Sequence, residues 1–545
     1  MKSTVLRNNI IITIAGLLLF VPFLGAVHLF DWDEINFAEC AREMLVTHDY
    51  FSVKINFQPF WEKPPLFIWM QAISMTLFGV SEFAARLPNA ICGVVTLLVL
   101  YNIGRKLVDE RFGLIWMLAY AGSFLPHFYF KSGIIDPWFN LFIFSGIYYF
   151  ILYTNAKAIR LLIISSLFIG LGVLTKGPVA VLVFALCVGV YWIIKKFRHV
   201  LTLKQILIFI IGVASVGGLW FLMLVLTGNS GIIKEFFLYQ VRLFSTQDAG
   251  HGGPFYYHWL VLLIGCFPVS VFALRSFKGS VSDTPFQKHF KLWMMILFIV
   301  VLILFSIVKT KIVHYSSLCY FPLSFMGAYV TYKLIAGEMQ WKKSTSVILM
   351  SIASVVGLLI FLLPFVDRYK QELISSNLID DAYTIENLKA NVYWSGFEGG
   401  IGLLLIVGVG VMLFYIKRKN IATGVIGIFI ISLITINLAA LIVAPKIEQY
   451  SQGAAIEFYQ YLKNEDCYVE TLGYKSYANL FYTNKREPLN KNSYDMDWLK
   501  LGPIDKTVYI VCKITDAEES KTRYPELKEI YRKNGFVFYV RKPKK

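Results

Sequence analysis

Long, unbroken blocks of hydrophobic residues recur from the N-terminus to about residue 444. Many of these blocks approach the roughly 20 residues that a helix needs to cross a bilayer. Because the blocks are continuous, they favour spanning helices over the strands of a β-barrel, which alternate apolar and polar residues. The pattern predicts about thirteen spans, at 9–29, 84–104, 112–130, 137–154, 159–175, 177–194, 205–227, 256–274, 292–308, 313–333, 345–366, 398–416 and 422–444.

The loops between these blocks fall into two alternating sets. One set is rich in Lys and Arg, as in "KKFRHVLTLKQ" and "YKLIAGEMQWKK", and the other contains Asp33, Glu34, Asp136 and Asp248. Cytoplasmic loops carry an excess of positive residues, so the first set is predicted to lie inside, together with the N-terminus. An odd number of spans then places residues 447–545 outside.

The composition agrees with a membrane protein. Of the 545 residues 57% are hydrophobic and 16% are charged, and the mean hydropathy is +0.60. A soluble protein would contain about 25% charged residues. The net charge of +17 is explained by the cytoplasmic loops, so we expect no nucleic-acid partner. The first block lacks a small-x-small cleavage site and is predicted to remain as an uncleaved span.

The chain is predicted to be an all-α polytopic membrane protein with a small α/β domain at its C-terminus. Residues 1–446 form the membrane domain, whose long first external loop covers 30–83, and residues 447–545 form the second domain. Strand-like pieces there are "CYVETLG", "TVYIVCKI" and "FVFYVRK", beside the helical "QGAAIEFYQYLKNED". If this domain is extracytoplasmic, Cys467 and Cys512 could pair, although nothing in the sequence requires it.

The first external loop is predicted to contain two interfacial helices. The first covers 34–48, with a broad apolar side and with Glu39, Arg42 and Glu43 as its polar remainder. The second covers 66–79. The segment "FWEKPP" is the elbow between them, at the outer membrane surface.

Two isolated carboxylates are candidate catalytic groups. Asp33 follows the first span and Asp136 lies between two spans, so both belong on the same side at the same depth. Each has a structural alternative. Asp31 or Asp33 could cap the following helix, and Asp136 could cap a helix that begins with Pro137. A carboxylate at this surface could equally serve as a general base, and ionisable groups at span ends are functional candidates.

Five cations stand in external loops, where the positive-inside bias should deplete them. Any one of them could simply extend its ammonium or guanidinium group to the lipid surface. Together they predict a convergent anion site, with phosphate as the natural anion at a membrane. They are Lys63, Lys176, Arg242, Lys309 and Lys311, with Gly177, His314 and Tyr315 beside them.

A divalent metal site is a weaker possibility. Glu62 in the elbow and His251 in the Gly-rich loop "DAGHGGPFYYHW" would supply two ligands, with substrate or water completing the set.

Several motifs together resemble a known family. They are "DWDEINFAECAREML", "FWEKPPLFIWMQAISMTLFGVSEFAARLPNAI", "SGIIDP", "TKGP", "DAGHGGPFYYH" and "KTKIVHYSSLCYFP". The set is similar to bacterial lipid A aminoarabinose transferases and their relatives in the protein O-mannosyltransferase family, which belong to the C-type glycosyltransferase superfamily. The likeness covers essentially the whole membrane part.

This resemblance implies an enzyme that transfers a sugar, with inversion, from a polyprenyl-phosphate carrier to an acceptor outside the cytoplasmic membrane. It implies that Asp33 is the catalytic carboxylate, Glu34 its motif partner and Asp136 the second acidic residue. Lys63 would contact the carrier phosphate, Glu62 and His251 would match a divalent-metal pair, and Tyr315 would match a tyrosine of the Lys-rich loop. The family often has an aromatic hydroxyl or Arg where this chain has "INF" after Asp33 and Glu34, which leaves the acceptor type open.

Further expectations follow from this assignment. The leaving phosphate ester is already anionic, so cations rather than a general acid serve the donor side. We expect no nucleotide cofactor, and either no metal or a divalent ion such as Zn, Mg or Mn. The acceptor is a lipid, a glycan or a protein, the protein is a monomer in the bacterial inner membrane, and the active site is periplasmic. The alternatives are a flippase for lipid-linked sugars and a lipid-linked glycan ligase.

Overall fold

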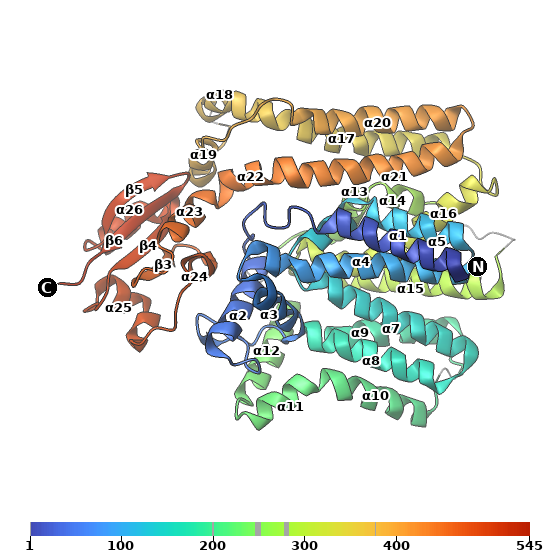
Figure 1. The fold of residues 1–545 in the computed structure, drawn as a ribbon, viewed down its shortest axis with the longest axis horizontal. Coiled ribbons are helices and arrows are strands. Elements are labelled where there is room, and N and C mark those ends of the chain that lie inside the picture. Colours follow the sequence, from blue (N-terminus) through green and yellow to red (C-terminus); the bar gives the residue numbers. More distant parts are fainter. Residues whose placement is uncertain (1, 199–200, 246–251, 277–282, 377, 545) are drawn as a thin grey trace.

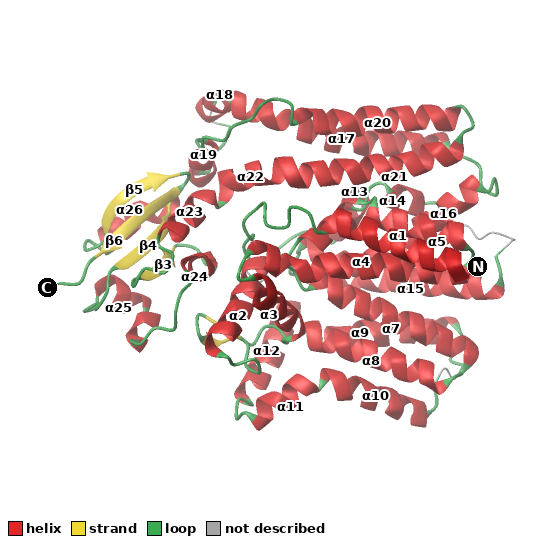
Figure 2. Cartoon of the chain, viewed as in Figure 1, coloured by secondary structure: helices red, strands yellow, loops and turns green. Residues whose placement is uncertain are grey.

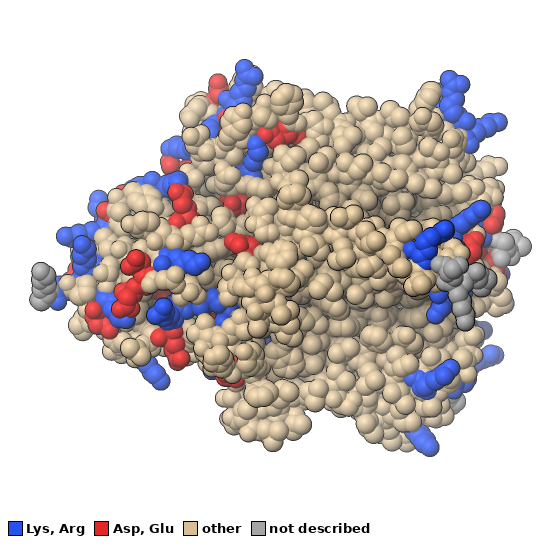
Figure 3. Space-filling view, in the orientation of Figure 1, with Lys and Arg blue, Asp and Glu red and all other residues tan. Residues whose placement is uncertain are grey.

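The computed structural model describes residues 2–198, 201–245, 252–276, 283–376 and 378–544. Long helices lie side by side in a bundle, and a small sheet lies at one end of it, where the chain also ends (Figures 1 and 2). In Figure 3 the charged side chains gather at the two ends of the molecule, with a broad uncharged band between them. Such a band is the surface that a bilayer covers.

Every one of the thirteen predicted ranges contains helix. The helices of the bundle are α1 (Lys2–Phe20), α4 (Glu82–Leu107), α5 (Glu110–Ala121), α6 (Phe124–Phe128), α7 (Asp136–Ala156), α8 (Ile159–Lys176), α9 (Val179–Ile194), α10 (Leu203–Gly217), α11 (Leu219–Leu226), α12 (Gly231–Ser245), α13 (Tyr257–Gly265), α14 (Val269–Ala273), α15 (Pro285–Ile307), α16 (Tyr320–Ile335), α17 (Lys343–Arg368), α20 (Gly399–Lys417) and α21 (Ile421–Leu438).

Not every one of these helices is long enough to cross a membrane on its own. Within the described residues, 6 helices are long and apolar enough to cross a membrane, or up to 8 if each of two bent pairs counts as one span. One bent pair joins Phe124–Lys131 to Asp136–Ala156 at 118°. The chain is therefore an integral membrane protein, while thirteen spans and their orientation stay predictions.

The first span is shorter than predicted. Helix α1 ends at Phe20 rather than continuing to residue 29, and Pro22 lies two residues further on. Proline has no backbone N–H and disfavours helix in the residue before it, so the helix ends there. The freed segment 21–30 reaches the region of the candidate site.

Small residues let neighbouring helices approach closely. A Cβ atom on Gly104 of α4 would lie 2.8 Å from the Cα atom of Gly113 in α5. A Cβ atom on Gly402 of α20 would lie 2.0 Å from the carbonyl oxygen of Gly357 in α17. Such contacts replace the hydrophobic driving force that is missing between helices in lipid.

The first external loop contains both predicted helices, α2 (Asp33–Thr47) and α3 (Leu66–Phe78), with a short hairpin of β1 (Lys54–Ile55) and β2 (Gln58–Pro59) between them. The predicted polar remainder of α2 is wrong, because Glu39, Arg42 and Glu43 are at most 1% exposed. Arg42 bonds both carboxylate oxygens of Glu39 and also Asn484 of the C-terminal part. Helix α2 is therefore packed inside protein rather than lying on the membrane.

The C-terminal part contains a four-stranded sheet in the order β3 (Tyr468–Leu472), β4 (Val508–Lys513), β6 (Phe536–Arg541) and β5 (Lys528–Lys533). Strands β3 and β4 are parallel and the other pairs are antiparallel. Beside it are helices α22 (Ala444–Ser451), α23 (Gly453–Tyr461), α24 (Ala478–Thr483), α25 (Met496–Leu501) and α26 (Ala517–Arg523).

The three strands expected from the sequence are present as β3, β4 and β6. Strand β5 was not expected, because its six residues are all exposed and lack an apolar alternation. Cys467 and Cys512 do not pair, since all seven cysteines are free. The boundary at residue 447 and the external position of this part stay predictions.

Candidate active site at the sheet end of the bundle

Two of the predicted carboxylates meet around a histidine. Asp33 begins α2, Asp136 begins α7, and His314 lies in the 3-10 segment η3 (Val313–Cys319). The Nε2 atom of His314 lies 3.2 Å from Oδ2 of Asp33 and 3.9 Å from Oδ2 of Asp136. The Asp33 side chain is 32% exposed, whereas that of Asp136 is 3% exposed. Asp33 is therefore the carboxylate that a substrate can reach.

Neither aspartate caps its helix. The residues at the caps are Trp32 and Ile135, and neither helix start shows a side-chain capping bond. Asp33 and Asp136 instead occupy the first turn, where an acidic side chain is favoured by the helix dipole. Helix capping therefore does not account for the positions of these carboxylates, which point to His314 and Lys176.

Lys176 completes this group from the last turn of α8. Its Nζ atom lies 2.6 Å from Oδ1 of Asp136 and 5.4 Å from the ring centre of Tyr315. A lysine is favoured at a helix C-terminus, and Gly177 then turns the chain with a φ of 91°. Tyr315 therefore lies in the cluster, as the sequence predicted.

A second group of charges lies on the elbow and on α12. Lys63 is 3.9 Å from Oε2 of Glu62, and its ammonium lies 5.2 Å from the ring centre of Tyr239. The hydroxyl of Tyr239 donates to Glu62. The exposed guanidinium of Arg242 lies 5.2 Å from the same ring centre. Two predicted phosphate-binding cations thus flank one tyrosine.

Charges from both groups act on the imidazole of His314. Burial lowers the pKa of His314, the nearby Asp136 and Asp33 raise it, and the positive charges of Lys176 and Lys63 lower it further. The net shift is downward from the usual value of 6.5, so the imidazole is neutral at pH 7.

Glu34 points away from Asp33 and anchors the loop. Its carboxylate accepts hydrogen bonds from Nε and Nη2 of Arg86 at 2.7 Å and from the backbone N–H of Phe30 and Gly133. Both oxygens are occupied and the residue is 4% exposed. These contacts hold the start of α2 against the segment before α7, and a catalytic part for Glu34 stays a prediction.

The two lysines of the Lys-rich loop, Lys309 and Lys311, lie in different environments. Lys311 donates to the carbonyl oxygens of Phe305, Ser306 and Val308, at the C-terminal end of α15. It caps this helix and does not point into the cluster of acids and cations. Lys309 is exposed on the same loop. The structure therefore places Lys63 and Arg242 around Tyr239 and Lys176 beside Asp136, whereas Lys311 contacts the end of α15.

The metal prediction is not tested by this structure. Glu62 contacts Lys63 and Tyr239, and His251 lies outside the described residues. Among the residues that are described, no group of three His, Cys, Asp or Glu side chains could hold a metal ion. A lysine neighbour is unfavourable for a cation, so the described partners of Glu62 favour an anion site more than a metal site.

Two functional neighbours were not assigned from the sequence. The sequence places His314 beside Tyr315 but predicts no separate role for it, and it gives no prediction for Tyr239. The signal for His314 was its place after two lysines in an external loop. Tyr239 gave none, because one tyrosine on an apolar helix is ordinary.

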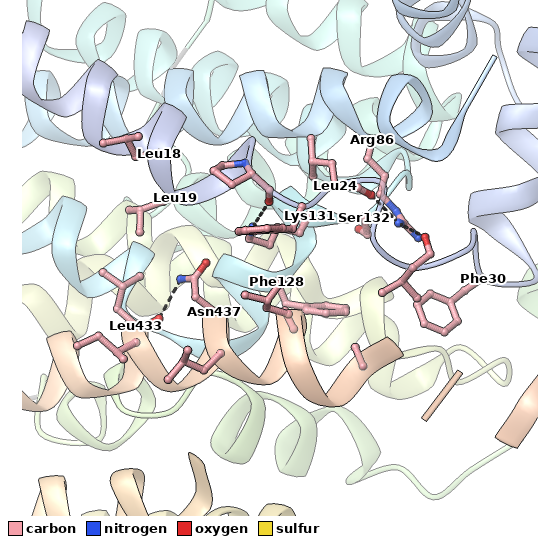
Figure 4. A pocket seen from close by; sticks show the side chains of 18 of the residues that line it. Leu18, Leu19, Leu24, Phe30, Arg86, Phe128, Lys131, Ser132, Leu433 and Asn437 are labelled. Atoms are coloured by element: carbon pink, nitrogen blue, oxygen red, sulfur yellow. Dashed lines mark hydrogen bonds between the residues drawn. The ribbon is translucent and has the colours of Figure 1, made fainter. Parts of the chain in front are cut away.

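Two apolar cavities lie between helices, and each is lined by a different set of them. One, of about 420 Å³, is bordered by α1, by the segment after α1, by α6 and by α21 (Figure 4). Figure 4 shows Leu18, Leu19 and Leu433 towards one end of it and Arg86 and Phe30 towards the other. The other cavity, of about 300 Å³, lies between α8 and α10, and Val173 and Pro178 on its wall flank Lys176 in sequence.

Sequence comparisons find similarity to known sugar transferases. Residues 62–226 match the family described as dolichyl-phosphate-mannose-protein mannosyltransferase. The undecaprenyl phosphate-alpha-4-amino-4-deoxy-L-arabinose arabinosyl transferase 1 of Proteus mirabilis is 28% identical over 57% of this chain and 56% of its own length. The corresponding transferase of Pectobacterium carotovorum is 25% identical over 59% of this chain and 58% of its own. The matched region thus spans little more than half of these relatives.

The fold similarity extends further than the sequence similarity. The crystal structure of ArnT from Cupriavidus metallidurans bound to undecaprenyl phosphate superimposes with a TM-score of 0.76 at 16% identity, covering 97% of both chains. Its form without ligand gives a TM-score of 0.75. These comparisons confirm the family resemblance that the sequence motifs predicted, and they show that the fold continues through the C-terminal part.

Proposed function

We propose that the chain is an inverting glycosyltransferase of the C-type superfamily, which moves a sugar from a polyprenyl-phosphate carrier to an acceptor at the periplasmic face of the membrane. The observation that carries this proposal is the convergence of Asp33, the Asp136–Lys176 pair and Lys63 from four separate elements. The cluster combines an accessible carboxylate with cations, which are the two functions that the reaction needs.

The donor phosphate fits the cations on the elbow and α12. The ion pair of Lys63 with Glu62 is long, at 3.9 Å, whereas Lys176 is held at 2.6 Å by Asp136. Lys63 is therefore the better phosphate ligand, and Arg242 offers a planar fork for two phosphate oxygens. The apolar cavity between α8 and α10, where Val173 and Pro178 flank Lys176 in sequence, supports a place for the first part of the carrier chain.

The acceptor side fits Asp33. A hydroxyl acceptor loses its proton to the carboxylate as its oxygen attacks the anomeric carbon, and the carrier leaves from the opposite face as a phosphate that needs no added proton. The cavity beside α1 and α21 supports a place for the apolar part of a lipid acceptor. Lipid A, a glycan and a protein remain the three acceptor classes, and the sugar is a hexose or a pentose.

The test uses purified protein in liposomes with a polyprenyl-phosphate-linked aminopentose as donor. Asp33→Asn should lower transfer by about 10²–10⁴-fold while the protein still binds the donor lipid. The matched control is Asp49→Asn, which removes an acid of the same loop that pairs with Lys54. Full transfer by the Asp33→Asn variant would remove the catalytic assignment.

The acceptor and the alternatives are separated by product analysis. Mass spectrometry of lipid A, envelope glycans and exported proteins, comparing a deletion strain with its parent, should show one sugar lost from one class. Translocation of intact donor lipid without transfer would instead identify a flippase, and loss of a whole glycan chain would identify a ligase.

A further inference from the structure

The imidazole of His314 lies between two carboxylates that come from distant parts of the chain. Its Nε2 atom faces Oδ2 of Asp33 at 3.2 Å and Oδ2 of Asp136 at 3.9 Å. The side chain is 14% exposed and packs edge to face on the ring of Tyr315. A ring in this position can serve either carboxylate by a small rotation.

The two carboxylates differ in their other contacts. Oδ1 of Asp136 holds the ammonium of Lys176, so this buried pair is neutral overall. Oδ2 of Asp136 is buried and accepts no hydrogen bond within the described part of the chain. A buried acceptor without a donor is unfavourable, and Nε2 of His314 is the donor placed to relieve it.

The proton on the neutral ring belongs on Nε2. Both neighbours of Nε2 are carboxylate oxygens, which accept hydrogen bonds and donate none while they are ionised. The main chain at this point is fixed as well, because the hydroxyl of Ser317 donates to the carbonyl of His314. The ring therefore has one N–H and two oxygens that compete for it.

We propose that His314 is the positioning residue for Asp33, and that its N–H moves from Asp33 to Asp136 as the reaction proceeds. Before transfer, Nε2–H donates to Oδ2 of Asp33 and leaves Oδ1 for the acceptor hydroxyl. This inference rests on the proposed function and on an acceptor that attacks through a hydroxyl oxygen.

The step balances in protons and charge. The acceptor O–H bond breaks as the new glycosidic C–O bond forms, the proton goes to Oδ1 of Asp33, and the bond from the anomeric carbon to the carrier phosphate breaks. Protonated Asp33 is a poorer acceptor, so Nε2–H turns to Oδ2 of Asp136, which is still ionised. His314 itself neither gains nor loses a proton.

Kinetics of two substitutions at His314 test this role. His314→Leu should lower kcat by about 10²-fold with donor KM changed by less than about threefold, because the donor cations are untouched. His314→Gln keeps a donor N–H and should recover at least about tenfold of that loss. Retained binding of a polyprenyl phosphate shows that each variant is folded.

A matched control comes from His258, which is buried and contacts Ser316 of the same segment. Its replacement by Gln removes a histidine near η3 without touching either aspartate, and kcat should stay within about threefold. A loss as large as that of His314→Leu would assign the effect to packing of η3 and overturn the proposal.

A double-mutant cycle with Asp33→Asn is the decisive measurement. If His314 acts through Asp33, adding His314→Leu to Asp33→Asn should cost less than about threefold, although alone it costs about 10²-fold. Additive losses would overturn the inference while leaving the glycosyltransferase intact. If the unmodified protein transfers no sugar to any acceptor, the proposed function itself is wrong.

Discussion

Arg86 should be the side chain whose loss most destabilises the loop that carries Asp33. It is buried in α4 and donates five hydrogen bonds, two to Glu34 and one each to the carbonyl oxygens of Leu24, Val27 and His28. The bonds to Glu34 are both 2.7 Å long. One guanidinium thus fixes the segment after α1 and the start of α2 together.

The magnitude follows from what Arg86→Met would leave behind. Glu34 would stay buried with only the backbone N–H groups of Phe30 and Gly133 as donors. Removing one partner of a buried ion pair costs about 3–5 kcal/mol, because the remaining charge is uncompensated. Replacing Glu34 by Gln in the same background should recover part of this loss, since no unpaired charge then remains.

The assay is equilibrium unfolding in mixed micelles, alongside the rate of sugar transfer at a temperature where the variant is folded. Arg418→Met, which removes an exposed arginine at the end of α20, is the control and should change stability by less than about 0.5 kcal/mol. A loss below about 1 kcal/mol for Arg86→Met, or a further loss on adding Glu34→Gln, would refute the anchoring role.

Three further outcomes are expected. Lys176→Met should abolish transfer, because it leaves Asp136 buried and without its cation. Lys311→Met should lower the melting temperature through the lost cap of α15, yet transfer by the folded protein should stay within about threefold of the unmodified rate. Transfer assays and thermal melts on both variants check this. Burial and the charge of the nearby Glu39 raise the pKa of Glu43 to about 9, so the folded protein holds a proton that the unfolded chain releases above about pH 4.5. The stability of the protein therefore falls as the pH rises from about 4.5 to about 9. In melts run across that range, Glu43→Gln should flatten this slope and add on the order of 2 kcal/mol of stability at pH 7. Ile434→Trp should fill the α1–α21 cavity and so raise KM for a lipid acceptor roughly tenfold, equivalent to about 1.4 kcal/mol. Ile430→Trp, one turn away and similarly exposed, should leave this KM unchanged. Equal KM values for the two variants would exclude this cavity from acceptor binding.

The sequence predicted the parts of the fold that depend on local pattern. Continuous apolar blocks predicted a helix in every expected range, and short pieces rich in β-forming residues predicted three of the four strands. Strand β5 lacked the pattern because none of its side chains is buried. Helix α2 was assigned correctly, but its buried charges were not, because their burial depends on Asn484 and its neighbours more than 400 residues away.

The candidate site was predictable as far as topology alone determines it. Loops on one side of a bundle converge, so Asp33, Asp136, Lys63 and Lys176 could be grouped without a structure. Side-chain direction could not be inferred in the same way. Glu34 follows Asp33 directly, yet it turns to Arg86, and Lys311 turns to the end of α15.

The pairing of charges favours Asp33, rather than another carboxylate of the cluster, as the proposed base. Asp136 is bound to Lys176, Glu62 has Lys63 beside it, and Glu34 is bound to Arg86. A carboxylate oxygen that already accepts from a neighbouring cation is less free to accept from an acceptor hydroxyl. Asp33 has no lysine or arginine partner in the described part of the chain, and its Oδ2 lies 3.2 Å from Nε2 of the neutral ring of His314. A cation introduced there, as in His314→Lys, should therefore lower kcat further than His314→Leu does, because it would pair with the base itself.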